Sequence, residues 1–382
     1  MKEIKRLSDH LKNRISDLAG ARNGGNKVIG YTPGGYMPEE LVLAAGAIPL
    51  GMIKGGDPSA VALADAYICR WLDPFCRSQI GYAVSGTDPY YSILDLLAVP
   101  VTDNHIRAVA DVISYNTRLK VFPFGVPHMK EQTAHDYYLH GLVQLRIKLE
   151  AVTGNKITDQ RLAEAILLCN RERELFRRIS ELRKKDAVPI SGSQFVALHH
   201  ASFLADKRFM VEILESLTET MAKAASRPAR RPRILLTGST LAQGDHSLLD
   251  MIEDSGGIVV MEEFAECIRP YWEDISIEGD PLAALADGYF QRRVPPAWFR
   301  PGQERRDFIV KLAREWHVDG VIWYQLMMRE SYKTESYYFQ DFLQQATGLP
   351  LFVVESDYEQ TEAGPMRTRV ETFLDVIGKG GR

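Results

Sequence analysis

Short runs of apolar residues alternate with amphipathic stretches along most of this chain. Each run has the length of a buried strand, whereas the stretches between them repeat apolar residues at the three-to-four spacing of a helix. This alternation is typical of parallel α/β architecture, because parallel strands need a crossover connection and a helix usually supplies it. The pattern predicts eight strands, at Lys27–Tyr31, Ile48–Ile53, Leu94–Val99, Leu119–Phe122, Arg233–Leu236, Ile258–Met261, Gly320–Tyr324 and Leu351–Val354.

The chain is expected to form more than one domain, since 382 residues exceed what one hydrophobic core usually supports. We predict an N-terminal helix and a first α/β domain over residues 1–130, a mainly helical segment over 131–225, and a second α/β domain over 226–382. The run SRPARRPR, Ser226–Arg233, is typical of a stiff, solvated linker. Further helices are predicted near Ser247–Asp254, Gln303–Trp316 and Tyr337–Thr347.

Charge and hydropathy argue against two classes of partner. With a formal net charge of -4, the chain lacks the excess positive charge expected of a nucleic-acid-binding protein. No apolar run approaches the length needed to span a bilayer. The first residues, MKEIKRLSDHLKNRI, predict a charged amphipathic helix without a signal-peptide core, so we expect a cytoplasmic protein. Cys69, Cys76, Cys169 and Cys267 are scattered, and no disulfide framework is expected in a reducing cytosol.

Acidic and basic residues gather after the last predicted strand. Glu355 and Asp357 follow the strand directly, and Arg367 and Arg369 lie beyond a Gly-Pro loop, where we expect a helix to begin. Acids at the carboxyl end of a strand and arginines at a helix start are typical of the crevice edge in α/β active sites. The alternative is an ordinary strand-to-helix turn with solvated charges.

Two other phrases complete a set with this C-terminal run. In YTPGGYMPEELVLAAGAIPLGM (Tyr31–Met52), a helix is predicted to begin at Pro38 and to stop at Gly46, and DGVIWYQ (Asp319–Gln325) predicts a strand. The phrases PEELVLAAGAIP, DGVIWY and VESD…MRTRVETF resemble, in order, those of the 2-hydroxyacyl-CoA dehydratase and benzoyl-CoA reductase subunit family. The resemblance spans nearly the whole chain. It implies two Rossmann-like parallel-sheet domains with a helical insert and an interdomain cleft, in agreement with the strand pattern.

The resemblance also implies positions for an iron–sulfur cluster. In that family, three cysteines of a subunit usually hold a [4Fe–4S] cluster whose fourth iron position is open to substrate. Cys76, in FCRSQIG, matches the first ligand phrase, but Val101–Asn104 and Met328–Glu330, at the second and third positions, contain no cysteine. Cys76 is therefore a candidate single retained ligand, and Asp103 could bind iron only through oxygen. We expect no conventional three-cysteine cluster here and place the [4Fe–4S] cluster on a partner subunit.

Two residues near these positions leave alternatives open. Cys69 precedes Cys76 by seven residues, but Asp73-Pro74 breaks a helix between them, so whether both thiols bind iron stays open. Arg329, at the third position, carries a positive charge that cannot be removed and that disfavours a metal. Its guanidinium could hold a substrate phosphate or carboxylate. Alternatively it fills the space that the cluster vacated and pairs with Glu330, Glu335 or Glu355.

The resemblance implies a subunit of an oxygen-sensitive enzyme that transfers a low-potential electron to an acyl-CoA thioester. Its partners would be a related cluster-bearing subunit, in a heterodimer, and an ATP-dependent activator protein. Glu355 is the candidate catalytic residue, and Arg329, Arg367, Arg369 and His128 are candidate substrate-binding residues. The alternative is a cluster-free acyl-CoA-binding or scaffold protein of the same fold. The acyl group, and the choice between dehydration and ring reduction, stay open.

Overall fold

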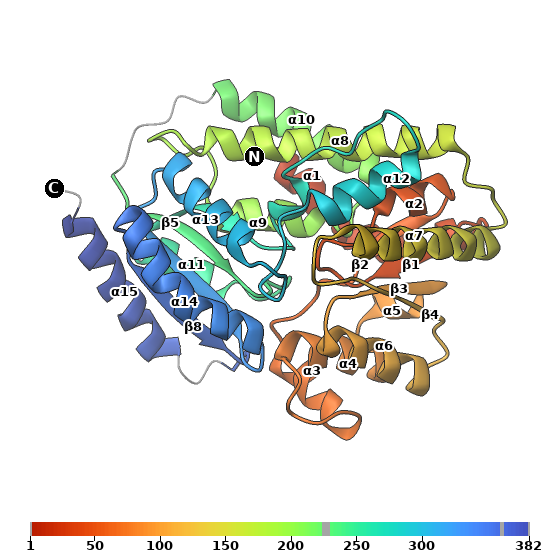
Figure 1. Ribbon diagram of the computed structural model, residues 1–382, viewed down its shortest axis with the longest axis horizontal. Helices are drawn as coiled ribbons and strands as arrows, with labels where there is room; N and C mark the ends of the chain where they lie inside the picture. The colour runs from red at the N-terminus through yellow and green to blue at the C-terminus, as the bar shows by residue number, and fades with distance from the viewer. Residues whose placement is uncertain (1, 224–229, 360–362, 381–382) are drawn as a thin grey trace.

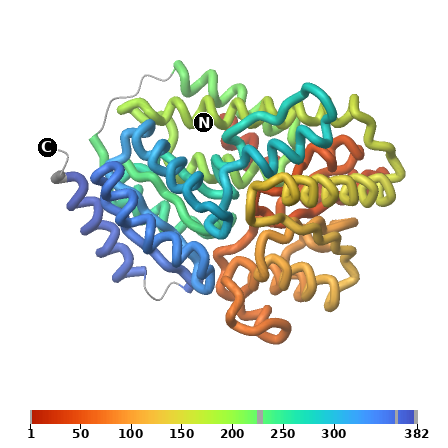
Figure 2. The backbone as a smooth tube through the Cα atoms, viewed as in Figure 1, coloured from red at the N-terminus to blue at the C-terminus, as the bar shows by residue number. Residues whose placement is uncertain are grey.

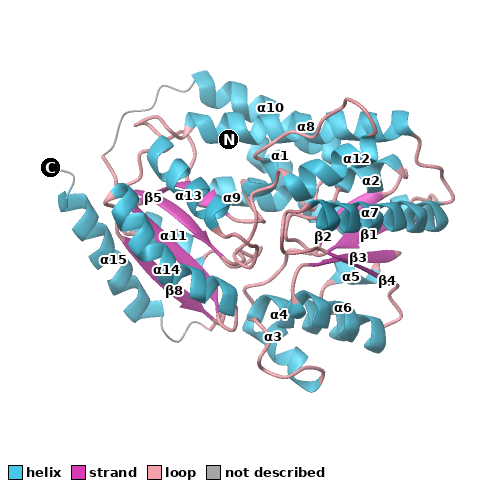
Figure 3. Ribbon diagram, in the orientation of Figure 1, coloured by secondary structure: helices cyan, strands magenta, loops and turns pink. Residues whose placement is uncertain are grey.

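The computed structural model describes residues 2–223, 230–359 and 363–380, and it contains two four-stranded, all-parallel sheets flanked by helices (Figures 1 and 3). All eight predicted strands are present, and the predicted α/β class with two Rossmann-like halves is confirmed. Residues 226–229 of the predicted linker lie outside the described residues. Within the described ranges, no helix is long and apolar enough to cross a membrane.

The first sheet has the strand order β2-β1-β3-β4. The chain passes from β1 to β2 on one side and then returns to β3 on the other, which creates a crevice at the carboxyl ends of β1 and β3. Leu94 packs closely on this sheet, because a Cβ at Gly30 would lie 2.5 Å from the end of the Leu94 side chain. The strands are β1 (Val28–Tyr31), β2 (Ile48–Gly51), β3 (Leu96–Val101) and β4 (Val121–Gly125).

The second sheet repeats this topology, with the order β6-β5-β7-β8. Its crevice therefore lies at the carboxyl ends of β5 and β7, where Gly238 is in register with Tyr324. Both sheets place the loops after their first and third strands at the topological switch point. The strands are β5 (Arg233–Gly238), β6 (Ile258–Glu263), β7 (Gly320–Leu326) and β8 (Leu351–Ser356).

Side-chain caps set the starts of the helices around the first sheet. Asp57, Asp73, Asp88 and Asp103 each accept backbone N–H groups of the helix that follows, and in the first three cases proline occupies the first turn. As predicted, the helix after Pro38 ends before Gly46. The helices are α1 (Lys2–Asn23), α2 (Glu39–Ala44), α3 (Pro58–Leu63), η1 (Ala64–Ala66), α4 (Pro74–Ser85), α5 (Pro89–Ser92) and α6 (Asn104–Asn116).

The middle of the chain is helical, as predicted, and its helices contact both halves. α8 packs on α2 of the first half, whereas α9 packs on β6 of the second half. In Figure 1, α8 runs across the top of the view above both sheets. The division at residues 130 and 225 stays a prediction. The helices are α7 (Gln132–Thr153), α8 (Asp159–Leu182), α9 (Gly192–Ser202) and α10 (Lys207–Lys223).

Two helix boundaries in the second half differ from the sequence prediction. The last helices are η2 (Arg269–Tyr271), α12 (Pro281–Ala286), η3 (Asp287–Gln291), α11 (Ser247–Asp254), α13 (Gln303–Glu315), α14 (Glu330–Thr347) and α15 (Ala363–Gly380). α14 begins at Glu330, seven residues before the predicted Tyr337. Arg367 and Arg369 lie inside α15 and not at its start. Proline is tolerated in a first helical turn, so Pro365 does not delay α15.

The two halves share an apolar core and pair through their backbones. One buried cluster joins Val28 and Leu50 of the first half to Leu236 and Tyr324 of the second. Lys54 forms an isolated parallel bridge with Gln243. A second bridge joins Met129 and Arg300. Figure 2 shows the first and second halves lying against each other along this junction.

Candidate functional site

Loops at the carboxyl ends of β3 and β7 meet the start of α4 between the two halves. Asp103 follows β3, Arg329 follows β7, and Asp73 caps α4. Arg329 Nη1 lies 3.2 Å from Asp103 Oδ2 and 3.5 Å from Asp73 Oδ2. One guanidinium of the second half therefore binds two carboxylates of the first.

Local backbone chemistry positions each of these side chains. The Asp73 carboxylate accepts the N–H of Cys76 at 3.0 Å, which places the thiol in the first turn of α4. The Asp103 carboxylate caps α6 in the same way, with 2.8 Å to the N–H of His105. Met328 adopts a left-handed backbone, φ 66°, between β7 and α14. These three turns fix the ends of the segments that meet at Arg329.

The charges at this site are buried and mutually compensated. The side chain of Arg329 is 9% exposed and that of Asp73 is 1% exposed. Burial opposes ionisation of Asp73, but the Arg329 guanidinium and His105 lower the pKa of the carboxyl to about 2. Burial, and then the charge of Asp73, raise the pKa of the Cys76 thiol well above its usual range. The site therefore holds two carboxylates, one guanidinium and one neutral thiol.

This set of side chains does not fit a cluster held by three thiolates. Cys76 is the one thiol at this site, since Cys69 is exposed and Cys169 and Cys267 are buried in other elements. In the part of the chain that the structure describes, no group of three or more His, Cys, Asp or Glu side chains is placed to hold a metal. Arg329, moreover, fills the third ligand position with a permanent cation. The donor set thus disagrees with the cofactor that the resemblance implies for such a subunit.

The partners of Arg329 differ from the three glutamates that the sequence suggested. Glu335 pairs with Arg305, and Glu355 pairs with Lys333 at 3.3 Å. Glu330 is the first residue of α14 and is exposed. The carboxylates that bind Arg329 come from the other half of the chain, which a local sequence pattern cannot reveal.

Two aromatic side chains lie beside the Arg329 guanidinium, and His128 contacts one of them. The guanidinium carbon Cζ lies 5.3 Å from the ring centre of Trp298 and 5.9 Å from that of Tyr332. His128 Nε2 lies 2.6 Å from the carbonyl oxygen of Thr102, and its ring contacts Trp298. The structure therefore brings Cys76, Asp103, Arg329 and His128 together. Sequence reasoning missed Trp298, which lies in an irregular segment with no periodic signal.

Glu355 and Arg367 line a different cavity, of about 430 Å³, at the carboxyl ends of β7 and β8. Tyr324 and Asp245 lie in its wall, and the Tyr324 hydroxyl donates a hydrogen bond to the Asp245 carboxylate. Burial raises the pKa of Asp245 to about 7. Gly56 of the first half also lines the cavity. The loop with Asp245 follows a predicted strand, and that position is the one sequence signal for this residue.

The remaining candidates lie at the outer edge of this region. Glu355 is exposed, and Arg367 lies 3.8 Å from Asp254. Arg369 does not line the cavity; its guanidinium lies over the Phe352 ring at 5.1 Å. Glu355 and Arg367 are thus brought together, whereas Arg369 is not.

The fold and the site together define a class of protein. Two parallel-sheet halves with the same strand order present polar residues at their switch points, and a buried ion-pair site joins them. The sequence profile of the 2-hydroxyglutaryl-CoA dehydratase D-component family matches residues 35–377, and the chain belongs to this family. This match confirms the resemblance seen in the three sequence phrases, and the chain is a component subunit of the kind that the family comprises.

Curated relatives agree with this assignment over most of their length. The Escherichia coli (strain K12) protein YjiM, which carries a provisional name as a dehydratase subunit, is 26% identical over 90% of this chain and 89% of its own. The beta subunit of (R)-phenyllactyl-CoA dehydratase from Clostridium sporogenes is 24% identical over 92% of each chain. A benzoyl-CoA reductase subunit from Thauera aromatica is 25% identical over 78% of this chain and 77% of its own.

Proposed function

We propose that this chain is the cluster-free subunit of an acyl-CoA dehydratase or reductase assembly. A related partner subunit carries the [4Fe–4S] cluster, and an ATP-dependent activator supplies the electron. Family membership and the names of relatives that act on phenyllactyl-CoA or benzoyl-CoA support the assignment to such an assembly. The observation that carries the cluster-free assignment is the Arg329 guanidinium bound between Asp73 and Asp103 beside the neutral Cys76 thiol.

In this proposal Arg329 acts as a positioning residue. Both of its carboxylate partners are on the first half, so the ion pairs fix the loop after β7 against that half. Trp298 and Tyr332 then hold a constant position beside His128. Trp298 and Tyr332 meet edge to face, and aromatic side chains of this kind suit the apolar acyl part of a thioester. We therefore assign acyl contact to these rings and to His128.

Glu355, Arg367 and Arg369 have separate roles in the proposal. Glu355 lines the cavity of about 430 Å³, where Lys333 is its one ion-pair partner among the described residues, and it remains our candidate for proton transfer. Arg367 and Arg369 are exposed on α15. Acidic side chains line the cavity itself, including Asp357 and Glu359, so we place the CoA phosphates at the exposed guanidinium groups and not inside the cavity.

Anaerobic purification with iron and sulfide analysis tests the assignment. The chain purified alone is expected to be colourless, with well under one iron per chain. Acyl-CoA turnover is expected only when a related iron-bearing subunit and an activator are both added. A brown protein with about four irons on this chain alone contradicts the proposal.

The same observation favours a second candidate, an acyl-CoA-binding or scaffold protein without redox work. No cysteine is present at the second and third ligand positions, and Arg329 closes the site. The two candidates differ in assembly. Co-purification with a cluster-bearing relative supports the first, whereas a chain that binds acyl-CoA and never associates with such a subunit supports the second.

A further inference from the structure

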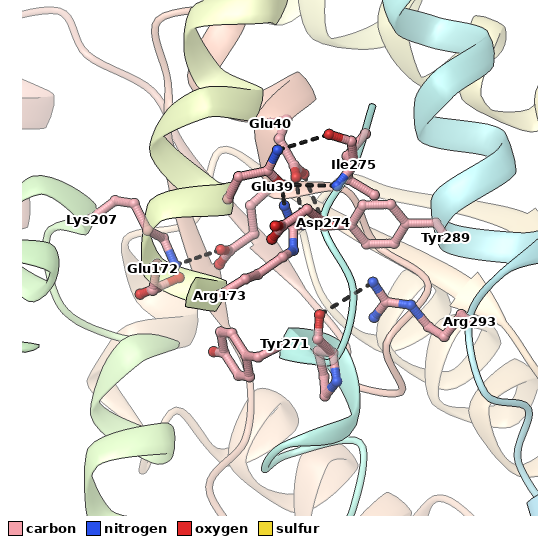
Figure 4. Close-up of polar contacts among 12 residues, drawn as sticks. Glu39, Glu40, Glu172, Arg173, Lys207, Tyr271, Asp274, Ile275, Tyr289 and Arg293 are labelled. Carbon is pink, nitrogen blue, oxygen red and sulfur yellow. Dashed lines mark hydrogen bonds and ion pairs between the residues drawn. The ribbon is translucent and has the colours of Figure 1, made fainter. Parts of the chain in front are cut away.

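A small polar cavity lies away from Arg329, among α2, α8 and the segment from Pro270 to Arg293 (Figure 4). It has a volume of about 40 Å³. Three acidic and three basic side chains gather in and around it: Glu39, Glu40, Glu172, Arg173, Lys207 and Arg293. Neither the sequence prediction nor the proposed function uses these residues.

Five of these six charged groups have an ion-pair partner. Lys207 Nζ lies 2.6 Å from Glu39 and 2.8 Å from Glu172. The Tyr31 hydroxyl donates a further hydrogen bond to Glu39, and the Ser202 hydroxyl donates one to Glu172. Burial raises the pKa of Glu172, which favours its neutral form and brings the group of three closer to zero charge.

The third acidic residue, Glu40, also has its hydrogen-bond partners within the protein. Its carboxylate accepts hydrogen bonds from Arg173 Nη2 at 2.6 Å and from the Tyr289 hydroxyl at 2.8 Å. Arg173 and Arg293 both lie over the Tyr289 ring, at 5.7 Å and 4.3 Å from its centre. Two guanidinium groups therefore share one ring, but the carboxylate beside that ring, Glu40, binds only Arg173 of the two.

Arg293 is the group left over. It is 7% exposed, and within the described ranges no carboxylate lies within 4.0 Å of its guanidinium nitrogens. Among the same residues, Nη1 has no hydrogen-bond partner, and Nη2 has only the carbonyl oxygen of Pro270 at 3.5 Å. Burying an unpaired cation is costly, because water no longer solvates it and no anion replaces the water.

A glycine keeps the free side of this guanidinium open. Gly35 has a φ of +85°, and a Cβ there would approach Arg293 Nη1 to 3.2 Å. Enclosing one water takes roughly 10 to 15 Å³, so the cavity has room for about three water-sized groups. That is the size of a small oxyanion and is far too small for a nucleotide.

We propose that this cavity binds a small carboxylate-type oxyanion, of the size of formate or bicarbonate, against Arg293. Planar oxygens of one negative charge match the unpaired Nη1 donor and neutralise the guanidinium. The inference goes beyond the proposed function. It does not depend on a cluster, a CoA thioester or a partner subunit.

Thermal unfolding of the full chain in sodium formate tests the site, with sodium sulfate of equal ionic strength as the reference salt. Arg293→Gln is compared with Arg292→Gln, its half-buried neighbour, which pairs with Asp287 at 2.7 Å and undergoes the same charge change. Formate is expected to raise the midpoint temperature of the wild type and of Arg292→Gln in a saturable way, and not that of Arg293→Gln. The same response to formate in all three proteins overturns the proposal.

A structure of the wild type grown in formate provides a measurement that does not need a folded variant. A planar anion within hydrogen-bonding distance of Arg293 Nη1 is the expected result. Water alone beside Nη1 overturns the proposal. Iron analysis of the same preparation is unaffected by either outcome, so failure here is separate from failure of the proposed function.

Discussion

At the scale of single residues, the site depends on one arginine, Arg329, which forms ion pairs across the two halves of the chain. Asp103 and Arg329 are 226 positions apart in the chain. The sequence resemblance placed Cys76, Asp103 and Arg329 at one site, and they do meet. Their pairing could not be predicted, because side-chain partners on distant loops leave no periodic signal.

Replacing Arg329 with methionine is expected to lower the free energy of unfolding by about 3 kcal/mol, since the buried Asp73 would keep only its contact with the His105 ring and the partly buried Asp103 would lose its guanidinium partner. Chemical denaturation measures this. Arg107→Met, which breaks an exposed pair with Asp111 on α6, is the matched control and should cost under about 1 kcal/mol. Equal losses in the two variants contradict the role of Arg329.

Asp245 is expected to make stability depend on pH. The pKa of Asp245 in the folded protein, about 7, lies above its ordinary value of 3.8. Between these two pH values the folded protein keeps a proton on Asp245 that the unfolded chain has released. The stability that this group contributes is present at acidic pH and is lost as pH rises to about 7. Asp245→Asn should therefore gain stability relative to the wild type across this range, by at most roughly 4 kcal/mol.

Denaturation curves at several pH values check the Asp245 prediction. Tyr324→Phe is a useful companion, because the Tyr324 hydrogen bond lowers the pKa of Asp245. Removing that bond should extend the pH-dependent window upward. If the curves of the wild type and Asp245→Asn run parallel from acidic to neutral pH, the group does not titrate as the geometry indicates.

At the scale of elements, the strands follow from local sequence, because short apolar runs bounded by turns fit buried parallel strands and little else. The helix start at Glu330 does not, since Arg329 has to leave β7 through a left-handed turn at Met328 and bind partners in the other half. Pro365 shows the reverse error, because a residue that usually ends helices lies here in the first turn of one.

Gly238, at the end of β5, is expected to tolerate no side chain. Its φ is +147°, and an added Cβ would overlap the carbonyl group of Tyr324. Gly238→Ala should therefore destabilise the protein by at least about 3 kcal/mol. Gly364→Ala in α15, where a Cβ meets open space, should be neutral or stabilising by up to about 1 kcal/mol. Comparable melting temperatures for the two variants contradict the prediction.

At the scale of the whole molecule, the helical segment joins the halves through buried charge as well as apolar contact. Arg183, just after α8, donates hydrogen bonds to Glu262 of β6 at 2.5 and 2.7 Å, and both side chains are fully buried. The sequence indicated two α/β units and helices between them. It did not indicate that the helices would pack on both units, because the apolar face of an amphipathic helix does not specify which surface it packs against.

Unfolding is therefore expected to be one cooperative transition, and calorimetric and van't Hoff enthalpies should agree. Arg183→Met should shift the whole transition to lower temperature, since it leaves Glu262 buried and unpaired. Arg178→Met, which removes an exposed pair with Glu174, is the control and should shift it little. Two resolved transitions in either variant would show that the halves unfold independently.

The junction between the halves has a consequence for evolutionary change. The bridge between Lys54 and Gln243 is made by main-chain atoms, and Gly55 N–H donates to the Gln243 carbonyl at 2.9 Å. The two backbones approach so closely that a Cβ at Gly56 would lie 2.6 Å from the Gly244 backbone, and a Cβ at Gly244 would lie 2.5 Å from the Gly55 carbonyl oxygen, so both positions require glycine. A side chain at either glycine would therefore push the two segments apart, whereas the side chains of Lys54 and Gln243 can change without loss of the main-chain bridge.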